Sequence, residues 1–160
     1  MARRRKFVAP VAAVGDGWEV TLDDDERNLI IRLVAELRDV LTGPADNELL
    51  ARLFPVAYPD DEEKEHEYQR LMREELVASR LWAIESVTNT LDPAHGPLDE
   101  GQTIAFMQSI NALRVVLGSM LDITDDESAD AADHTDTPEH HLYDFLSWLL
   151  EWTVRSLSPS

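Results

Sequence analysis

Histidines one helical turn away from a carboxylate are the side chains of this sequence that could hold a metal ion or transfer a proton. His66 follows Glu62 by four residues, and His140 precedes Asp144 by four, with His141 beside it. On a helix this spacing brings imidazole and carboxylate onto one face, as metal binding and general acid–base catalysis require. The residues around His66 form a solvated acidic face, and His140 stands where a helix begins. We therefore expect no metal, no cofactor and no catalytic residue, and keep a metal-dependent enzyme as a second alternative.

A polar strip lies on the fourth predicted helix. Asn111, Arg114 and Gly118 recur at i, i+3 and i+7, which places them on one side of that helix beside its apolar stripe. A guanidinium with apolar neighbours needs a counter-charge, and Asp144 or Glu85 could supply one within the chain. The glycine would let another helix approach closely. The strip is interpreted either as a salt bridge that orders the helices or as a site for an anion or a partner.

One further arginine joins this candidate cluster. Arg52-Leu53-Phe54-Pro55 is typical of a helix end closed by an aromatic plug. The candidate interaction or structural polar cluster therefore contains five residues: Arg52, Asn111, Arg114, Gly118 and Asp144.

Charge divides the chain into a short basic start and an acidic body. The 160 residues contain 14 Lys and Arg against 32 Asp and Glu, a net charge of −18. Without Arg3, Arg4, Arg5 and Lys6, the rest has 10 basic and 32 acidic residues, a net charge of −22. Such a body repels phosphate backbones, so nucleic acid is not expected to bind it. A direct DNA-binding regulator that uses the four basic residues remains the first alternative.

Composition excludes several classes of protein. There is no cysteine, which rules out disulfides, zinc–thiolate and iron–sulfur sites, and thiol catalysis. No apolar run approaches the roughly 20 residues of a membrane-spanning helix, and the apolar stretch 7–14 is short and interrupted by proline. With 44% hydrophobic residues, the chain has enough apolar material for a core. We expect one cytoplasmic domain over 1–160 with no membrane contact.

Hydrophobic periodicity predicts a mainly α fold, a five-helix bundle-like domain with an N-terminal β-hairpin. The expected parts are the hairpin (6–21), a helical core (24–121), an acidic flexible linker (122–137) and a C-terminal helix (138–157). The core is expected to contain helices at 24–42, 46–53, 61–90 and 99–121.

Two expectations concern how these elements pack. The helix at 61–90 is expected to turn one stripe inward, made of Tyr68, Leu71, Met72, Leu76, Trp82 and Val87. An isolated hairpin is marginally stable, so the hairpin is expected to lie on the helices or on the hairpin of a second copy. The second arrangement would make a homodimer.

Three segments resemble a known family: residues 52–55, 110–118 and 143–146. They resemble actinobacterial proteins that contain a domain of unknown function, whose genes often lie beside the gene for the ClpS protease adaptor. Some members are automatically named oxidative-stress transcriptional regulators. The resemblance extends from the hairpin to the last helix and carries no known chemistry.

The resemblance also covers the polar strip. The family pattern is close to leucine-asparagine-aspartate-leucine-arginine followed by leucine-glycine; Asn111, Arg114 and Gly118 match it, while Ala112 stands where an acid is usual. The resemblance implies a regulatory role. With no catalytic motif in the sequence, we expect a non-enzymatic regulatory or protein-interaction protein, linked through unidentified protein partners to stress-responsive transcription or proteolysis.

Overall fold

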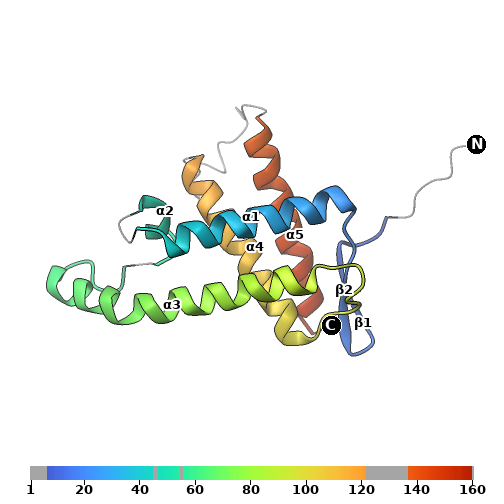
Figure 1. Cartoon of the computed structure of the whole chain (residues 1–160), viewed down its shortest axis with the longest axis horizontal. Coiled ribbons are helices and arrows are strands. Elements are labelled where there is room, and N and C mark those ends of the chain that lie inside the picture. The colour runs from blue at the N-terminus through green and yellow to red at the C-terminus, as the bar shows by residue number, and fades with distance from the viewer. Residues whose placement is uncertain (1–6, 45–46, 55, 122–136, 160) are drawn as a thin grey trace, which may run out of the picture.

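The computed structural model describes residues 7–44, 47–54, 56–121 and 137–159. These residues form a two-stranded antiparallel hairpin followed by five helices (Figure 1), which confirms the predicted fold class. The elements are β1 (Val11–Val14), β2 (Gly17–Val20), α1 (Asp24–Thr42), α2 (Glu48–Ala51), α3 (Glu62–Thr90), α4 (Glu100–Met120) and α5 (Pro138–Leu157). Most of the predicted linker lies outside the described residues.

Polar caps determine where the long helices begin. Asp23 and Asp99 each accept a hydrogen bond from the backbone N–H three residues later, and in both cases the side chain of that later residue bonds back to the cap. Thr137 caps α5, whose first residue is proline. These local motifs satisfy backbone donors that a helix start leaves unpaired, so the observed starts lie within one residue of the predicted ones.

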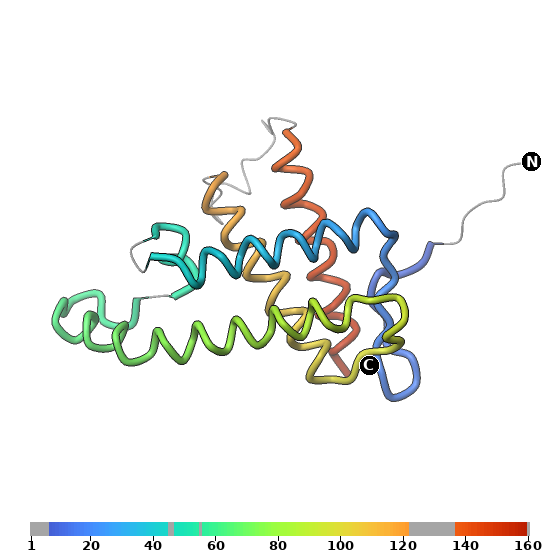
Figure 2. The backbone as a smooth tube through the Cα atoms, viewed as in Figure 1, coloured from blue at the N-terminus to red at the C-terminus, as the bar shows by residue number. Residues whose placement is uncertain are grey.

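The helices pack in two layers around α4. Figures 1 and 2 show α1 and α3 lying across α4 and α5, and contacts join α4 to α1, α2, α3 and α5. Phe106 and Ile110 of α4 are at most 1% exposed and lie in the centre of the core. Because α4 meets partners on several sides, its buried residues are not confined to one stripe.

The hairpin lies on helices of its own chain. Gly15 adopts a φ of 61°, which favours glycine at the turn, and Val11 of β1 is buried against the helices. The backbone of Trp18 exchanges two hydrogen bonds with Leu98 in the α3–α4 loop, at 2.9 and 2.7 Å. Its indole N–H donates to the carbonyl of Ser156 at 2.9 Å. The N-terminal segment is therefore attached to the end of α5.

The predicted inner stripe of α3 is wrong at two positions. Leu71 is 63% exposed and Trp82 is 60% exposed. The first half of α3 extends beyond α4 and α5 (Figure 2), and its covered face is only partly buried. That face includes Tyr68, Met72 and Leu76, and Leu71 lies outside it. Near the other end, the small residue Ala83 faces the core, and its larger neighbour Trp82 points outward.

Among the described helices, none is long and apolar enough to cross a membrane.

Candidate functional site

Arg114 lies where α4 packs against α5. Its Nε donates a hydrogen bond to Ser147 Oγ at 2.8 Å, and its guanidinium carbon lies 5.2 Å from the centre of the Tyr143 ring. The predicted salt bridge to Asp144 or Glu85 is wrong, because no ion pair between described residues includes Arg114. Tyr143 and Ser147 are one turn apart and face α4, whereas Asp144 is rotated about 100° around α5 and is exposed.

Gly118 makes room for the same aromatic ring. A Cβ atom on Gly118 would lie 3.2 Å from Tyr143 Cε2, closer than ordinary van der Waals contact. The predicted close approach of a helix to Gly118 is therefore present, and the approaching helix is α5. Asn111 is partly buried on α4, and Arg52 is exposed at the C-terminal end of α2.

The structure thus joins two of the five predicted cluster residues. Arg114 and Gly118 combine with Tyr143 and Ser147 into a contact between α4 and α5, which we call the arginine–tyrosine contact. The sequence did not lead us to predict Tyr143 and Ser147 as members of this contact. Their i, i+4 spacing on the final helix was the available signal.

Gly118 and Tyr143 are expected to be energetically coupled. In a Tyr143→Ala background, Gly118→Ala is expected to raise the free energy of unfolding by about 1 kcal/mol, because alanine is the better helix former. In the unaltered chain the gain is expected to be smaller, since the added methyl group meets the ring. Urea denaturation of the four proteins gives the coupling as a double-mutant cycle. Equal changes in both backgrounds would show that the ring does not restrict residue 118.

The histidines are not assembled into a site by the described residues. His66 is exposed on α3. Thr137 Oγ1 and His140 Nδ1 share a hydrogen bond of 2.6 Å at the start of α5, and the His140 N–H donates to the same hydroxyl at 3.3 Å. Across the described part of the chain, no three histidine or acidic side chains converge as metal ligands. The basic residues 3–6 lie outside the described residues.

The side chain of Glu65 forms hydrogen bonds to the loop that precedes α3. The Glu65 carboxylate accepts hydrogen bonds from the N–H groups of Ala57 and Tyr58 and from the Gln69 amide, at 3.0 to 3.1 Å. Desolvation raises the pKa of Glu65, but these hydrogen bonds favour the charged form and leave the pKa below its ordinary value. The carboxylate therefore holds the backbone at residues 57–58 against the first turns of α3.

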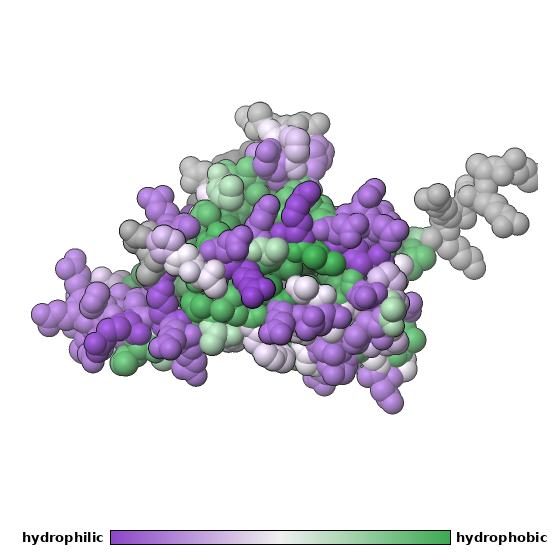
Figure 3. Space-filling model, in the orientation of Figure 1, coloured by the Kyte–Doolittle hydropathy of each residue, from purple (hydrophilic) through white to green (hydrophobic). Residues whose placement is uncertain are grey.

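An apolar groove lies between α1, α4 and α5. It has a volume of about 260 Å³. Figure 3 shows hydrophobic surface where α1 crosses the layer behind it. Its lining includes Leu37 and Val40 of α1, Leu49 of α2, Val116 and Met120 of α4 and Leu142 of α5, together with Glu36, the one charged side chain in the described lining. We call this the α1–α4–α5 groove.

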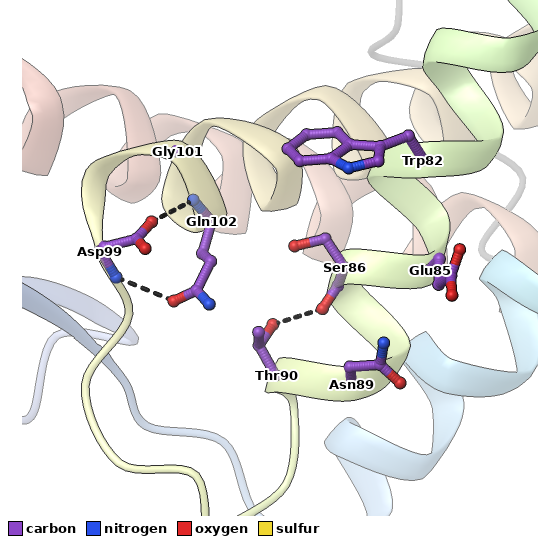
Figure 4. A pocket seen from close by; sticks show the side chains of 8 residues that line it. All are labelled: Trp82, Glu85, Ser86, Asn89, Thr90, Asp99, Gly101 and Gln102. Carbon is purple, nitrogen blue, oxygen red and sulfur yellow. Dashed lines mark hydrogen bonds between the residues drawn. The ribbon is translucent and has the colours of Figure 1, made fainter.

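A second hollow, the Trp82 pocket, lies between the end of α3 and the start of α4 (Figure 4). Its volume is about 510 Å³. Trp82, Glu85, Ser86, Asn89 and Thr90 line it from α3, and Asp99, Gly101 and Gln102 line it from the start of α4. The pocket is open, and apart from Trp82 and Gly101 its lining residues carry polar or charged side chains, in contrast to the groove.

The described residues define a mainly helical domain with an N-terminal hairpin, a partly buried polar contact between its last two helices, the α1–α4–α5 groove and the Trp82 pocket. A family model described as a domain of unknown function (DUF2017) matches residues 5–157. The chain therefore belongs to the DUF2017 family. Comparisons with curated proteins and with solved structures found no match.

Proposed function

We propose that this protein is a non-enzymatic regulatory protein that binds a protein partner through the α1–α4–α5 groove. The observation that supports this is an apolar hollow at the meeting point of α1, α2, α4 and α5, whose lining residue Met120 is 64% exposed. Apolar grooves between helices commonly receive the apolar face of a partner helix. Methionine suits such a surface, because its flexible thioether adapts to different side chains.

Charge supports a specific chemistry for the partner. Glu36 is the one charged side chain in the described lining, and the chain has a net charge of −18. A field of this sign attracts positive segments and repels acidic ones. The proposed partner therefore presents an amphipathic helix, with large apolar side chains for the groove and Lys or Arg beside them.

The resemblance to the actinobacterial proteins encoded beside the ClpS gene supports a finer proposal. The partner would act in stress-responsive transcription or in proteolysis, and the protein would work in the cytoplasm. The groove supplies a physical means for this role, because regulation through a partner requires a binding surface and no reaction at the surface itself.

Met120→Glu is expected to reduce partner capture at least tenfold, because it adds a charge to the groove and to an already acidic surface. A photo-cross-linking amino acid is placed at Val116, and the yield of cross-linked partner in the native cell measures capture. Mass spectrometry then identifies the cross-linked chain. Leu71→Glu is the matched control, since Leu71 is 63% exposed and Met120 is 64% exposed. Both variants are expected to keep the circular dichroism of the unaltered protein.

The two variants distinguish loss of binding at the groove from the effect of adding a negative charge anywhere on the surface. Retained capture by Leu71→Glu and lost capture by Met120→Glu would support the proposal. Equal capture by both variants, or a cross-linked chain without a basic amphipathic helix, would contradict it. If the cross-linked chain is a second copy of this protein, the groove mediates self-association and does not bind a different partner.

A further inference from the structure

The exposed indole of Trp82 is an unusual feature of α3. A tryptophan has a large apolar surface, yet this side chain is 60% exposed and borders a pocket. Figure 4 shows the indole spanning one side of the pocket, with Ser86 below it and Asp99 and Gln102 on the opposite side. The indole ring is therefore accessible to a ligand that enters the pocket from solvent.

The start of α4 does not make this a site for anions. A helix N-terminus usually attracts negative charge through its unpaired N–H groups. Here Asp99 Oδ1 accepts from the Gln102 N–H at 2.7 Å, and Gln102 Oε1 accepts from the Asp99 N–H at 3.0 Å. The carboxylate of Asp99 thus brings its own negative charge to the place that an anion would occupy.

The charged groups of the pocket have one sign. Glu85 and Asp99 are the ionisable side chains in its described lining, and both are acidic. An electron-rich indole face beside carboxylates attracts positive charge, and tryptophan is the best aromatic partner for a cation. At about 510 Å³ the pocket is far larger than a metal ion, and no three metal-ligating side chains converge within the described residues.

We propose that the Trp82 pocket binds an organic cation, a guanidinium or alkylammonium group. The cation lies against the indole face of Trp82, with Asp99 and Glu85 as its counter-charges. Ser86 and Asn89 offer further oxygen acceptors for its N–H groups. The proposal does not depend on the α1–α4–α5 groove, since the two hollows share no lining residue.

The test follows the indole N–H signals of ¹⁵N-labelled protein by NMR during titration. The probes are arginine amide, a short peptide with one arginine and neutral flanks, and the same peptide with citrulline, which has nearly the same shape without the charge. Trp82→Phe assigns the Trp82 signal. The expected result is a saturable shift of this signal with both arginine probes and at least tenfold weaker binding of the citrulline peptide.

Two variants test the assigned roles. Trp82→Leu is expected to raise the dissociation constant about two- to fivefold through loss of the cation–π contact, as followed by the backbone signals of Gly101 and Gln102. Asp99→Asn is expected to weaken binding to a similar extent, because asparagine caps a helix equally well and removes only the charge. Trp148→Phe, on the exposed surface of α5, is the control and is expected to bind as the unaltered protein does.

The probes also distinguish the source of the cation. Tighter binding of the arginine peptide than of arginine amide supports a side chain of a partner, and equal binding supports a free small molecule. The proposal is overturned if neither arginine probe gives a saturable shift at millimolar concentration. It is equally overturned if the citrulline peptide binds as well as the arginine peptide.

Discussion

Phe106→Ala is expected to lower the free energy of unfolding by about 3–5 kcal/mol, a large share of the stability of an ordinary domain. Phe106 is 1% exposed and lies in the first half of α4, the helix that contacts all four of the others in the described residues. Truncating the ring removes its packing in the hydrophobic core and leaves a cavity that the surrounding helices cannot fully close. Urea denaturation followed by far-ultraviolet circular dichroism measures the change.

Phe106→Leu is the control for this prediction. It keeps most of the apolar volume, so the expected loss is less than about 1.5–2 kcal/mol. A loss below about 1 kcal/mol for the alanine variant would contradict the central position of α4, because such small values are typical of sites that can collapse or that face solvent.

Trp18→Ala is expected to lower the free energy of unfolding by about 3 kcal/mol. The residue connects three separate parts of the chain: β2, the α3–α4 loop through Leu98, and the end of α5 through Ser156. Without the ring, the hairpin loses the indole hydrogen bond to the end of α5 and the apolar surface that the ring buries, whereas β1 keeps its own packing on α5. The loss is measured by chemical denaturation at several protein concentrations.

Trp18→Phe separates the two contributions. Phenylalanine keeps an aromatic ring but has no N–H for the Ser156 carbonyl, so a loss of about 1 kcal/mol is expected. The protein concentration tests the alternative role of the hairpin as a dimer arm. Stability that rises with concentration in the unaltered protein, and no longer does so in Trp18→Ala, would show that Trp18 acts between copies and not within one chain.

Helix positions were predictable because their signals are local. Asp23, Asp99 and Thr137 are polar caps immediately before apolar periodic segments, and Pro138 occupies a first helical position. A cap bonds to an N–H only two or three residues away, so its effect does not depend on the rest of the fold. The predicted bounds of the four long helices agree with the structure within one residue. The shortest helix was predicted at 46–53 and is confined to Glu48–Ala51.

Side-chain partners were not predictable in the same way. Arg114 was expected to meet a carboxylate, and it meets a hydroxyl and an aromatic ring instead. Which side chain reaches it depends on the rotation of α5 about its own axis, and one residue of rotation, about 100°, exchanges Tyr143 for Asp144. Leu71 and Trp82 illustrate the same limit, since an apolar residue is buried only where another element covers it.

The order of residues was therefore enough to determine the mainly helical class, the ends of the long helices and the acidic character of the body, because caps, periodicity and charge act over a few neighbouring residues. Only the packing of the helices decided that the hairpin attaches to α5 through Trp18 and that Arg114 stacks on Tyr143. Packing also created the α1–α4–α5 groove and the Trp82 pocket. Each hollow is lined by side chains from different helices, and the angles at which those helices cross set the distances between the side chains.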